Sequence, residues 1–310
     1  MNGLKFLLFL FLVSCSGHEK IAYKNFRENQ KKHPTSVGSL AYQDLGKGSP
    51  IILLHGVPTS SWMYRKVIGG LSEGHRVIPV DLIGYGGSSK PKRKPEAYRP
   101  AEQARRVRGL AKSLGLKKYS LMFHDMGGLV AWEMLRQDRE AISNLIVLNT
   151  IIREEGFNPP DFKPGAMTKV ISKAMVSPLT NDAVLGLTFK SLGLGSDHKL
   201  NSSECFGYVQ PLREGGGEAL YEFYTSLNPT LYRRLAANQS VFRKFKGRTL
   251  VLWGTQDKIL TEGQLPFLRE NLGVREEDIY LYPKNDHYLV EEIPGEVVKR
   301  VSDFLARDGR

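Results

Sequence analysis

One aspartate in this chain lies where a β-strand is predicted to turn abruptly into a helix. An apolar stretch over Tyr119–Phe123 is followed by His124, Asp125 and Met126, and a helical stretch begins near Gly128. A side chain on so tight a turn is pushed out over the edge of the sheet, and glycines two and three residues later let the backbone pass. A carboxylate held there can attack an sp³ carbon and form an alkyl ester. We therefore predict that Asp125 is a nucleophile.

Two side chains that follow later strands have the chemistry needed to hydrolyse such an ester. Asp257 lies just past a strand predicted to end at Trp253, and His287 lies just past the next strand, which ends at Tyr282. A water molecule deprotonated by His287 would attack the ester, while Asp257 would hold the imidazole tautomer and stabilise the imidazolium. This chemistry requires no metal and no organic cofactor.

Two backbone N–H groups are predicted to stabilise the charge that develops on Asp125 during this hydrolysis. Met126 follows the nucleophile directly, and Val57 follows the predicted strand Ile51–Leu54. N–H groups at these positions would form an oxyanion hole. A different hypothesis stays open, in which Asp125 is an inactivating replacement and the protein only binds a ligand.

The elements that must position these residues alternate between strands and helices. Such alternation predicts a parallel sheet with helices on both faces. Strands are expected at Leu40–Gln43, Ile51–Leu54, Arg76–Val80, Tyr119–Phe123, Leu145–Leu148, Thr249–Trp253 and Ile279–Tyr282. Helices are expected near Ser61–Leu71, Ala101–Leu114, Leu129–Gln137, Glu262–Asn271 and Glu296–Leu305. Because Gly46 and Gly48 separate the first two strands, we expect a hairpin between them.

The alternation stops between Ile151 and Gly247, which indicates an insertion. That stretch has helical pieces, glycines and prolines, and no convincing strand. We expect residues 151–247 to form a helical cap inserted between two strands and packed over the carboxyl edge of the sheet, where open α/β sheets bind their ligands. The remaining core domain then comprises residues 37–150 and 248–310.

Four motifs, taken in order, are similar to those of one known group of enzymes. They are His55-Gly-Val-Pro-Thr-Ser-Ser-Trp-Met-Tyr-Arg65, Asp81-Leu-Ile-Gly-Tyr-Gly-Gly-Ser88, His124-Asp-Met-Gly-Gly128, and the late Asp257 with His287. The chain resembles the Asp-nucleophile branch of the α/β-hydrolases, which contains epoxide hydrolases and haloalkane dehalogenases. The resemblance covers residues 39–150 and 248–305 and implies the α/β-hydrolase fold. Phe123 and Asp286 depart from the family pattern, which usually has a small residue and a glycine there.

The tryptophans bear on which leaving group the site accepts. In haloalkane dehalogenases, the resemblance implies, indole N–H groups hold the halide, one of them from the residue after the nucleophile. The other donor is a cap tryptophan or an asparagine in the first motif. Here these positions hold Met126 and Val57, and the only tryptophans, Trp62, Trp132 and Trp253, lie in the core domain. The usual halide clamp is therefore missing.

Tyrosines of the cap offer an alternative donor. The resemblance implies that epoxide hydrolases use cap tyrosines to donate a hydrogen bond to the departing epoxide oxygen. The candidates here are Tyr208, Tyr221, Tyr224 and Tyr232. We therefore predict an epoxide hydrolase-like enzyme for a small hydrophobic substrate, with a haloalkane dehalogenase that has an atypical halide site as the alternative.

The first residues of the chain predict export. The apolar run Phe6–Val13 is too short to span a bilayer but matches the core of a signal peptide. It ends in Leu-Val-Ser-Cys15, which resembles the lipobox of bacterial lipoproteins. We expect residues 1–14 to be the signal peptide, Cys15 to carry the lipid and residues 15–36 to form a polar tether. The protein would then be anchored to a bacterial membrane, and Cys205 would have no cysteine partner.

The composition bounds the remaining possibilities. The chain has 310 residues, of which 41% are hydrophobic and 25% charged. These fractions are typical of a globular protein and exclude disordered, collagen-like and polytopic membrane classes. The net charge is +12, with basic clusters in residues 90–108 and 231–248 that face solvent or could contact anionic headgroups. No nucleic-acid-binding motif accompanies this charge, so we expect no nucleic-acid partner. No feature of the sequence indicates an oligomeric state.

Overall fold

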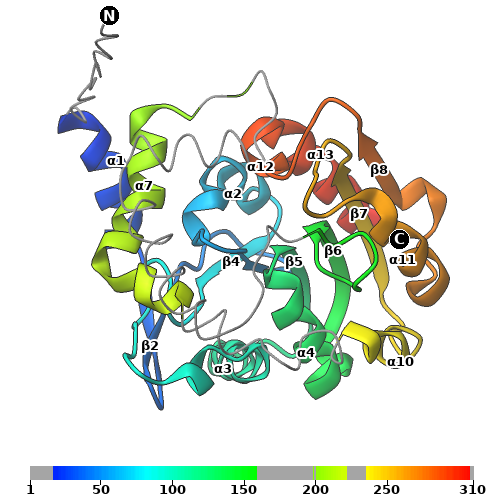
Figure 1. The fold of residues 1–310 in the computed structure, drawn as a ribbon, viewed down its shortest axis with the longest axis horizontal. Helices are drawn as coiled ribbons and strands as arrows, with labels where there is room; N and C mark the ends of the chain where they lie inside the picture. The colour runs from blue at the N-terminus through cyan, green and yellow to red at the C-terminus, as the bar shows by residue number, and fades with distance from the viewer. Residues whose placement is uncertain (1–16, 159–197, 199, 222–234, 308–310) are drawn as a thin grey trace, which may run out of the picture.

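An eight-stranded sheet runs through the molecule (Figure 1). The computed structural model describes residues 17–158, 198, 200–221 and 235–307. The strand order is β1-β2-β4-β3-β5-β6-β7-β8, in which β3 to β8 are parallel and β1 and β2 are antiparallel to their neighbours. The strands are β1 Lys31–Thr35, β2 Gly38–Tyr42, β3 Pro50–Leu54, β4 Arg76–Asp81, β5 Tyr119–Asp125, β6 Ile142–Thr150, β7 Arg248–Gly254 and β8 Ile279–Tyr282. This mostly parallel sheet confirms the predicted fold class.

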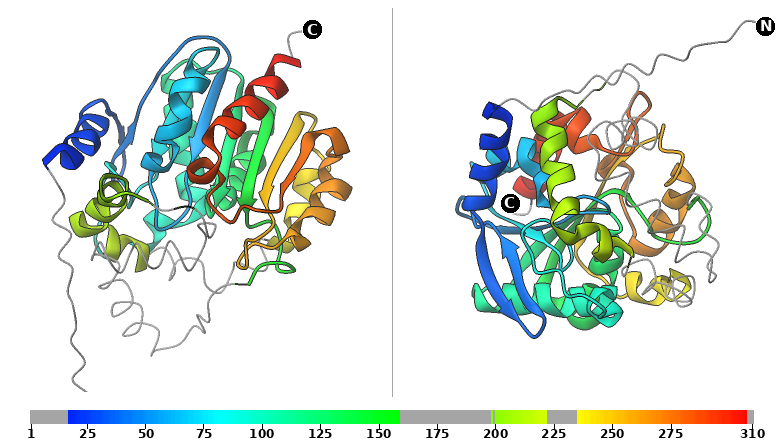
Figure 2. Two further views of the ribbon diagram at one scale, coloured as in Figure 1. Left: turned by 90° about the horizontal axis from the view of Figure 1, so that it is seen from above. Right: turned by 60° about the vertical axis from the view of Figure 1, so that its left-hand side comes forward.

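Helices cover both faces of the sheet, and the side chains of β3 show why. Ile51 and Leu53 belong to one buried cluster, and Ile52 and Leu54 to another, because successive side chains of a strand point to opposite faces. Both faces of the central strands are buried, which explains their nearly continuous apolar sequences. On the face of Ile51 lie α2 (Arg65–Ser72), α12 (Leu289–Glu292) and α13 (Pro294–Ala306) (Figure 2). On the other face lie α3 (Pro100–Ser113), α4 (Gly127–Asp138), α10 (Asn238–Phe242) and α11 (Leu265–Leu272).

The expected hairpin between the first two predicted strands is wrong. Strand β2 pairs with β4 in antiparallel orientation, and β4 separates β2 from β3 in the sheet. The glycine-containing turn does reverse the chain, but β3 takes its place between β4 and β5, where both of its edges form parallel pairs. A central position lets β3 satisfy both edges and bury both faces, which a hairpin at the edge of the sheet would not.

The segment between β6 and β7 is helical wherever it is regular in the described residues. It contains α7 (Ser202–Pro211), the kinked turn Leu212–Gly216 and α10, and no described residue between 151 and 247 belongs to a strand of the sheet. The flanking strands β6 and β7 pair directly with each other. The insertion therefore leaves the sheet after one strand and returns to the neighbouring one, as expected of a cap.

The expectation of a tether over residues 15–36 is wrong for the described part of that range. Residues Gly17–Glu28 form α1, and β1 pairs with β2 along its length. Tyr23 of α1 is buried and packs edge-on against Trp62 and Phe206, with ring centroids 5.3 and 5.9 Å apart. Tyr23 and Phe26 lie on one face of α1, so two aromatic side chains dock a helix that is mostly polar. Among the described helices, none is long and apolar enough to cross a membrane.

The docking of α1 gives the first prediction. Tyr23→Ala should lower the free energy of unfolding by about 3 kcal/mol, since truncating a buried aromatic side chain leaves a cavity between Trp62 and Phe206. The measurement is urea denaturation of the purified protein. Asn25→Ala, at an exposed position of the same helix, is the matched control and should change the stability little. Equal effects of the two substitutions would contradict the docking of α1.

Candidate active site

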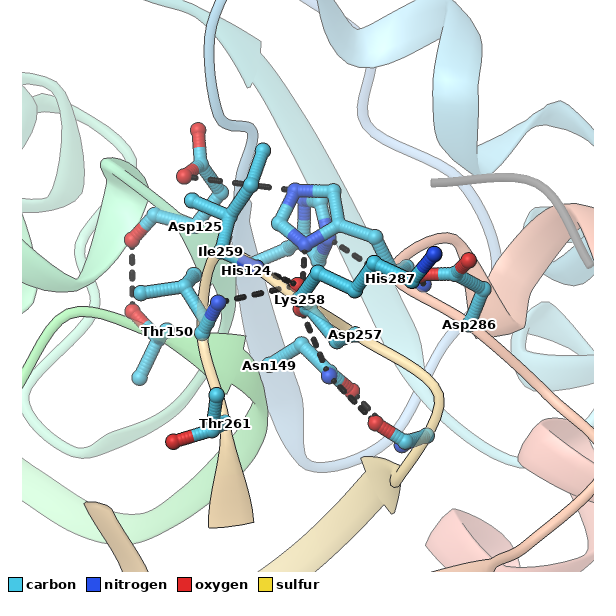
Figure 3. A network of polar contacts seen from close by, with 12 residues as sticks. His124, Asp125, Asn149, Thr150, Asp257, Lys258, Ile259, Thr261, Asp286 and His287 are labelled. Carbon is cyan, nitrogen blue, oxygen red and sulfur yellow. Dashed lines mark hydrogen bonds and ion pairs between the residues drawn. The ribbon is translucent and has the colours of Figure 1, made fainter. Parts of the chain in front are cut away.

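The backbone at Asp125 has a left-handed conformation, with φ of 50°. Non-glycine residues seldom adopt this conformation, which occurs where the surrounding structure imposes it. A Cβ on Gly127 would lie 2.6 Å from the carbonyl oxygen of Leu54, and a Cβ on Gly128 would lie 2.0 Å from Thr150 Oγ1. Both positions therefore require glycine. The Thr150 hydroxyl donates to the carbonyl oxygen of Asp125 at 2.6 Å (Figure 3). The turn predicted from the two glycines is present.

The carboxylate of Asp125 accepts hydrogen bonds from the two predicted backbone donors. Val57 N–H donates to Oδ2 at 2.9 Å, and Met126 N–H also donates to this carboxylate. A Cβ on Gly56 would lie 2.5 Å from the same oxygen, so glycine is needed to let the backbone approach. Burial raises the pKa of Asp125, while the positive charge of His287 and the two N–H donors oppose that rise. Both N–H groups that were predicted to form an oxyanion hole thus lie at the carboxylate of Asp125.

Asp257 and His287 form a second hydrogen-bonded pair beside Asp125. The imidazole Nδ1 of His287 lies 2.6 Å from Asp257 Oδ2 (Figure 3). The other oxygen of Asp257 accepts from the N–H groups of Ile259 and Leu260, each at 2.9 Å. Burial favours the neutral form of Asp257, but the charge of His287 and these hydrogen bonds outweigh it and lower the pKa. The carboxylate is therefore ionised and fixed on one nitrogen of the imidazole.

Asn149 completes the support of Asp257, and sequence reasoning gave it no part in the site. Its amide donates to Asp257 Oδ2 at 2.9 Å, and it exchanges two hydrogen bonds with the backbone of Gly254. Asn149 lies at the end of β6, next to the end of β7, and its neighbours in space are remote in sequence. The only signal for it was its place at the carboxyl end of a strand.

The second imidazole nitrogen of His287 faces Asp125. Nε2 lies 4.0 Å from Asp125 Oδ1, which is too long for a direct hydrogen bond. Burial alone would lower the pKa of His287, but the charges of Asp257, Asp125 and Asp286 outweigh it and raise the pKa to about 9. At neutral pH the imidazole is therefore protonated, and its charge favours the ionised form of Asp125.

His124, which precedes Asp125, holds the backbone of His287. Its Nε2 lies 2.8 Å from the carbonyl oxygen of His287, and the two rings are 4.4 Å apart. Burial and the neighbouring charge of His287 hold the pKa of His124 well below its usual range, so the ring is neutral. A carbonyl oxygen only accepts, so the proton of His124 resides on Nε2. We therefore assign His124 the role of supporting the backbone of His287 and not the role of a base.

Asp286 brings a further carboxylate to the site. It lies where the family pattern usually has glycine, and its Oδ1 accepts from the backbone N–H of His287 at 2.8 Å. Burial and the charge of Asp257 raise its pKa to about 6. At neutral pH the group is mostly ionised, and its charge adds to those that stabilise the His287 imidazolium.

All three tryptophan indoles already donate to backbone carbonyl groups. Trp62 Nε1 donates to Glu204 at 3.1 Å, Trp132 Nε1 to Ile151 at 2.8 Å and Trp253 Nε1 to Leu260 at 3.1 Å. These are the only tryptophans in the chain. An indole N–H has one proton to donate, so none of them is available to a departing halide.

The four candidate tyrosines differ in what the structure shows. The hydroxyl of Tyr208 is buried and hydrogen-bonded to the carboxylate of Glu291 in α12. Tyr221 is half-buried in a helical turn that follows Gly216, and Tyr224 and Tyr232 lie outside the described residues. Tyr208 thus already has an acceptor for its proton, which leaves the other three as candidate donors to an epoxide oxygen.

The titratable side chains of the site form hydrogen bonds with one another. They do not form a cluster of metal ligands. Across the described residues, no group of three or more His, Cys, Asp or Glu side chains is arranged to bind a metal ion. The site brings together a carboxylate with two N–H donors and a histidine oriented by a second carboxylate. This constellation can carry a nucleophilic displacement followed by hydrolysis.

A family model described as the alpha/beta hydrolase fold matches residues 49–293. The chain belongs to this family. It is 28% identical over 280 residues to epoxide hydrolase 3 of Xenopus tropicalis, covering 84% of this chain and 73% of that protein. It is 27% identical over 275 residues to haloalkane dehalogenase 2 of Mycobacterium tuberculosis, covering 86% of this chain and 91% of that protein. These relatives support a hydrolase.

A solved structure shows that the likeness extends through the fold of this α/β-hydrolase. The crystal structure of a haloalkane dehalogenase from Bradyrhizobium elkani superposes with a TM-score of 0.72 and 21% identity. The match covers 89% of this chain and 98% of that one. At this identity the likeness supports the fold, and the reaction must be inferred from the site.

Asp286 gives the second prediction. Asp286→Asn should lower the pKa of His287 from about 9, because one of the charges that stabilise the imidazolium is removed. The pH above which His287 is neutral, and can act as a base, should fall with it. An NMR titration of the imidazole measures this shift, with Asp303→Asn on the exposed face of α13 as control. An unchanged pKa in Asp286→Asn would show that its charge does not reach the imidazole.

Proposed function

We propose that this α/β-hydrolase opens an epoxide in a small hydrophobic substrate through a covalent ester on Asp125. The observation that carries the proposal is the environment of Asp125: two backbone N–H donors on its carboxylate and, beside it, the His287–Asp257 pair. Such donors serve little purpose around a carboxylate that only binds a ligand. They serve an acyl oxygen that becomes negative when water attacks.

The first step is a displacement at carbon. Because Oδ2 is the oxygen held by Val57 N–H, we assign the attack to Oδ1. A bond forms between Oδ1 and an sp³ carbon of the substrate, and the carbon–oxygen bond of the epoxide breaks. Its electron pair stays on the ring oxygen, which takes a proton from a donor of the enzyme; Tyr221, Tyr224 and Tyr232 are the candidates. The protonated His287 offsets the charge of Asp125 before the attack.

The second step is hydrolysis of the ester. His287 gives its proton back to the tyrosinate left by the first step and then takes one from a water molecule, whose oxygen attacks the carbonyl carbon of Asp125. The negative charge moves to Oδ2, where Val57 N–H stabilises it, and Met126 N–H donates to the same carboxyl group. When the intermediate collapses, the diol leaves with the proton from His287. The carboxylic acid left on Asp125 then gives its proton to His287, which restores the carboxylate and the imidazolium. Asp257 stabilises the imidazolium and fixes its tautomer.

The trapped ester gives the third prediction. In His287→Gln the displacement should still occur, while hydrolysis should slow by several orders of magnitude because the base is missing. Intact-mass measurement after exposure to substrate should show an adduct, and peptide mapping should place it on Asp125. Asp257→Asn should be less severe. An inactive His287→Gln protein without an adduct, using a substrate that the wild type consumes, would refute the two-step mechanism.

The leaving group gives the fourth prediction. A halide that leaves a dry site needs N–H donors, and the indoles of Trp62, Trp132 and Trp253 are all engaged. Loss of one preorganised donor typically slows a reaction by about 10²–10³-fold. Diol formation from a small epoxide should therefore exceed bromide release from a bromoalkane with the same carbon skeleton.

Tyrosine variants test the donor in the same assay. At least one of Tyr221→Phe, Tyr224→Phe and Tyr232→Phe should lose most epoxide activity while retaining the unfolding midpoint of the wild type. Faster bromide release, with all three variants fully active on epoxides, would favour the dehalogenase instead. No turnover of either substrate class would favour a ligand-binding protein.

We also propose that the protein is exported and anchored through a lipid on Cys15. The apolar run that ends at this cysteine supports the proposal. As the fifth prediction, Cys15→Ser should abolish incorporation of labelled fatty acid and release the protein from the membrane fraction of a bacterium that makes lipoproteins. Wild-type protein that takes up no fatty acid in such a host would contradict the anchor.

A further inference from the structure

A buried cluster of charges joins the cap to the core domain near the active site. Glu291 of α12 has a fully buried side chain, which accepts from Arg65 Nη2 at 2.9 Å, from Lys66 Nζ at 3.0 Å and from the hydroxyl of Tyr208. Glu204 of α7 pairs with the same two cations, at 2.9 Å from Arg65 and 2.6 Å from Lys66. Two cations from the start of α2 therefore hold one carboxylate of the cap and one of the core.

The charged and hydrogen-bonding partners in this cluster fix α7 in one position on the core domain. A buried carboxylate is costly unless charged partners and hydrogen-bond donors surround it, and removal of one partner leaves the rest uncompensated. Glu291 has three partners, and one of them, Tyr208, belongs to the cap. The guanidinium of Arg65 also lies over the ring of Trp62, 4.8 Å from its centroid. Shifting α7 along the core would break several of these contacts at once.

The cluster lies next to the proposed catalytic base. Helix α12 begins at Leu289, two residues after His287, and the N–H of Glu291 donates to the carbonyl oxygen of Tyr288 at 2.9 Å. The ring of Tyr288 packs edge-on against the imidazole of His287, with centroids 4.7 Å apart. His124 packs against both rings, with centroids 4.4 Å from the imidazole and 5.2 Å from Tyr288. A shift of Glu291 would therefore be transmitted through Tyr288 to His287.

We propose that Glu291 and Tyr208 are positioning residues, which hold the His287 imidazole in place by tying α12 to the cap helix α7. The proposal rests on the two-step mechanism for its kinetic consequence. In this proposal Tyr208 is not the proton donor to the epoxide oxygen. A donor would speed the first step and act only on epoxides, whereas a positioning residue would speed the hydrolysis of every ester formed on Asp125.

The kinetic test separates the two steps. Tyr208→Phe and Glu291→Gln should slow hydrolysis of the ester by 10-fold or more, so that the adduct on Asp125 accumulates, while its rate of formation changes less than 2-fold. Tyr98→Phe is the matched control, since Tyr98 is buried and its hydroxyl donates to the carbonyl oxygen of Pro91 rather than to Glu291, and it should change neither rate. Slower formation of the adduct in Tyr208→Phe, with normal hydrolysis, would overturn the proposal and identify a donor.

A spectroscopic test does not depend on the reaction. The proton between His287 Nδ1 and Asp257 should give a low-field ¹H NMR signal, assigned by its loss in His287→Gln. Tyr208→Phe, the milder substitution, and Glu291→Gln should shift or broaden this signal, and Tyr98→Phe should leave it unchanged. An unaltered signal in both variants, with wild-type unfolding midpoints, would show that the cluster does not position the imidazole and is a structural contact only. If no adduct forms even in His287→Gln, the two-step mechanism fails, while this signal still decides whether Glu291 and Tyr208 position the imidazole.

Discussion

The left-handed backbone of Asp125 is the constraint on which the site depends. An aspartate does not adopt φ of 50° without compensation, and here the compensation comes from several elements. Gly127 and Gly128 let α4 approach β3 and β6, and the Thr150 hydroxyl holds the carbonyl oxygen of the strained residue. This conformation places the carboxylate over the carboxyl edge of the sheet, where Val57 N–H donates a hydrogen bond to it. The parallel arrangement of β3, β5 and β6 makes this meeting possible, because these strands end side by side.

The balance of charges around one imidazole links the two proposed steps. Asp125, Asp257 and Asp286 together keep His287 protonated in the free enzyme, with a pKa of about 9, and the imidazolium in turn favours the ionised nucleophile. Formation of an ester removes the charge of Asp125. The pKa of His287 then falls, and the imidazole becomes available as a base at the moment when a base is needed. On this account the substrate itself switches His287 from a stabilising charge to a proton acceptor.

Much of the sheet and of the site could be predicted from the sequence, because both depend on local patterns. Apolar runs marked the central strands, and Asp125, Asp257 and His287 each follow such a run, so the topology brings them together. Other features depend on contacts between residues far apart in the chain. Asn149 supports Asp257 across two strands, and Tyr208 bonds to Glu291, and neither has a local signature. The docking of α1 was missed because only two aromatic side chains hold it against the core within a mostly polar sequence.

The central claim, that Asp125 itself carries the substrate, is tested most directly by the fate of a labelled oxygen atom. A single turnover with excess enzyme in H₂¹⁸O, followed by mass spectrometry of the peptide that contains Asp125, locates the incorporated oxygen. Because water attacks the carbonyl carbon of the ester, we expect ¹⁸O in the carboxylate of Asp125 and unlabelled oxygen in the newly formed hydroxyl of the product. If ¹⁸O enters the product in that first turnover and Asp125 stays unlabelled, water attacks the substrate directly and no ester forms on Asp125.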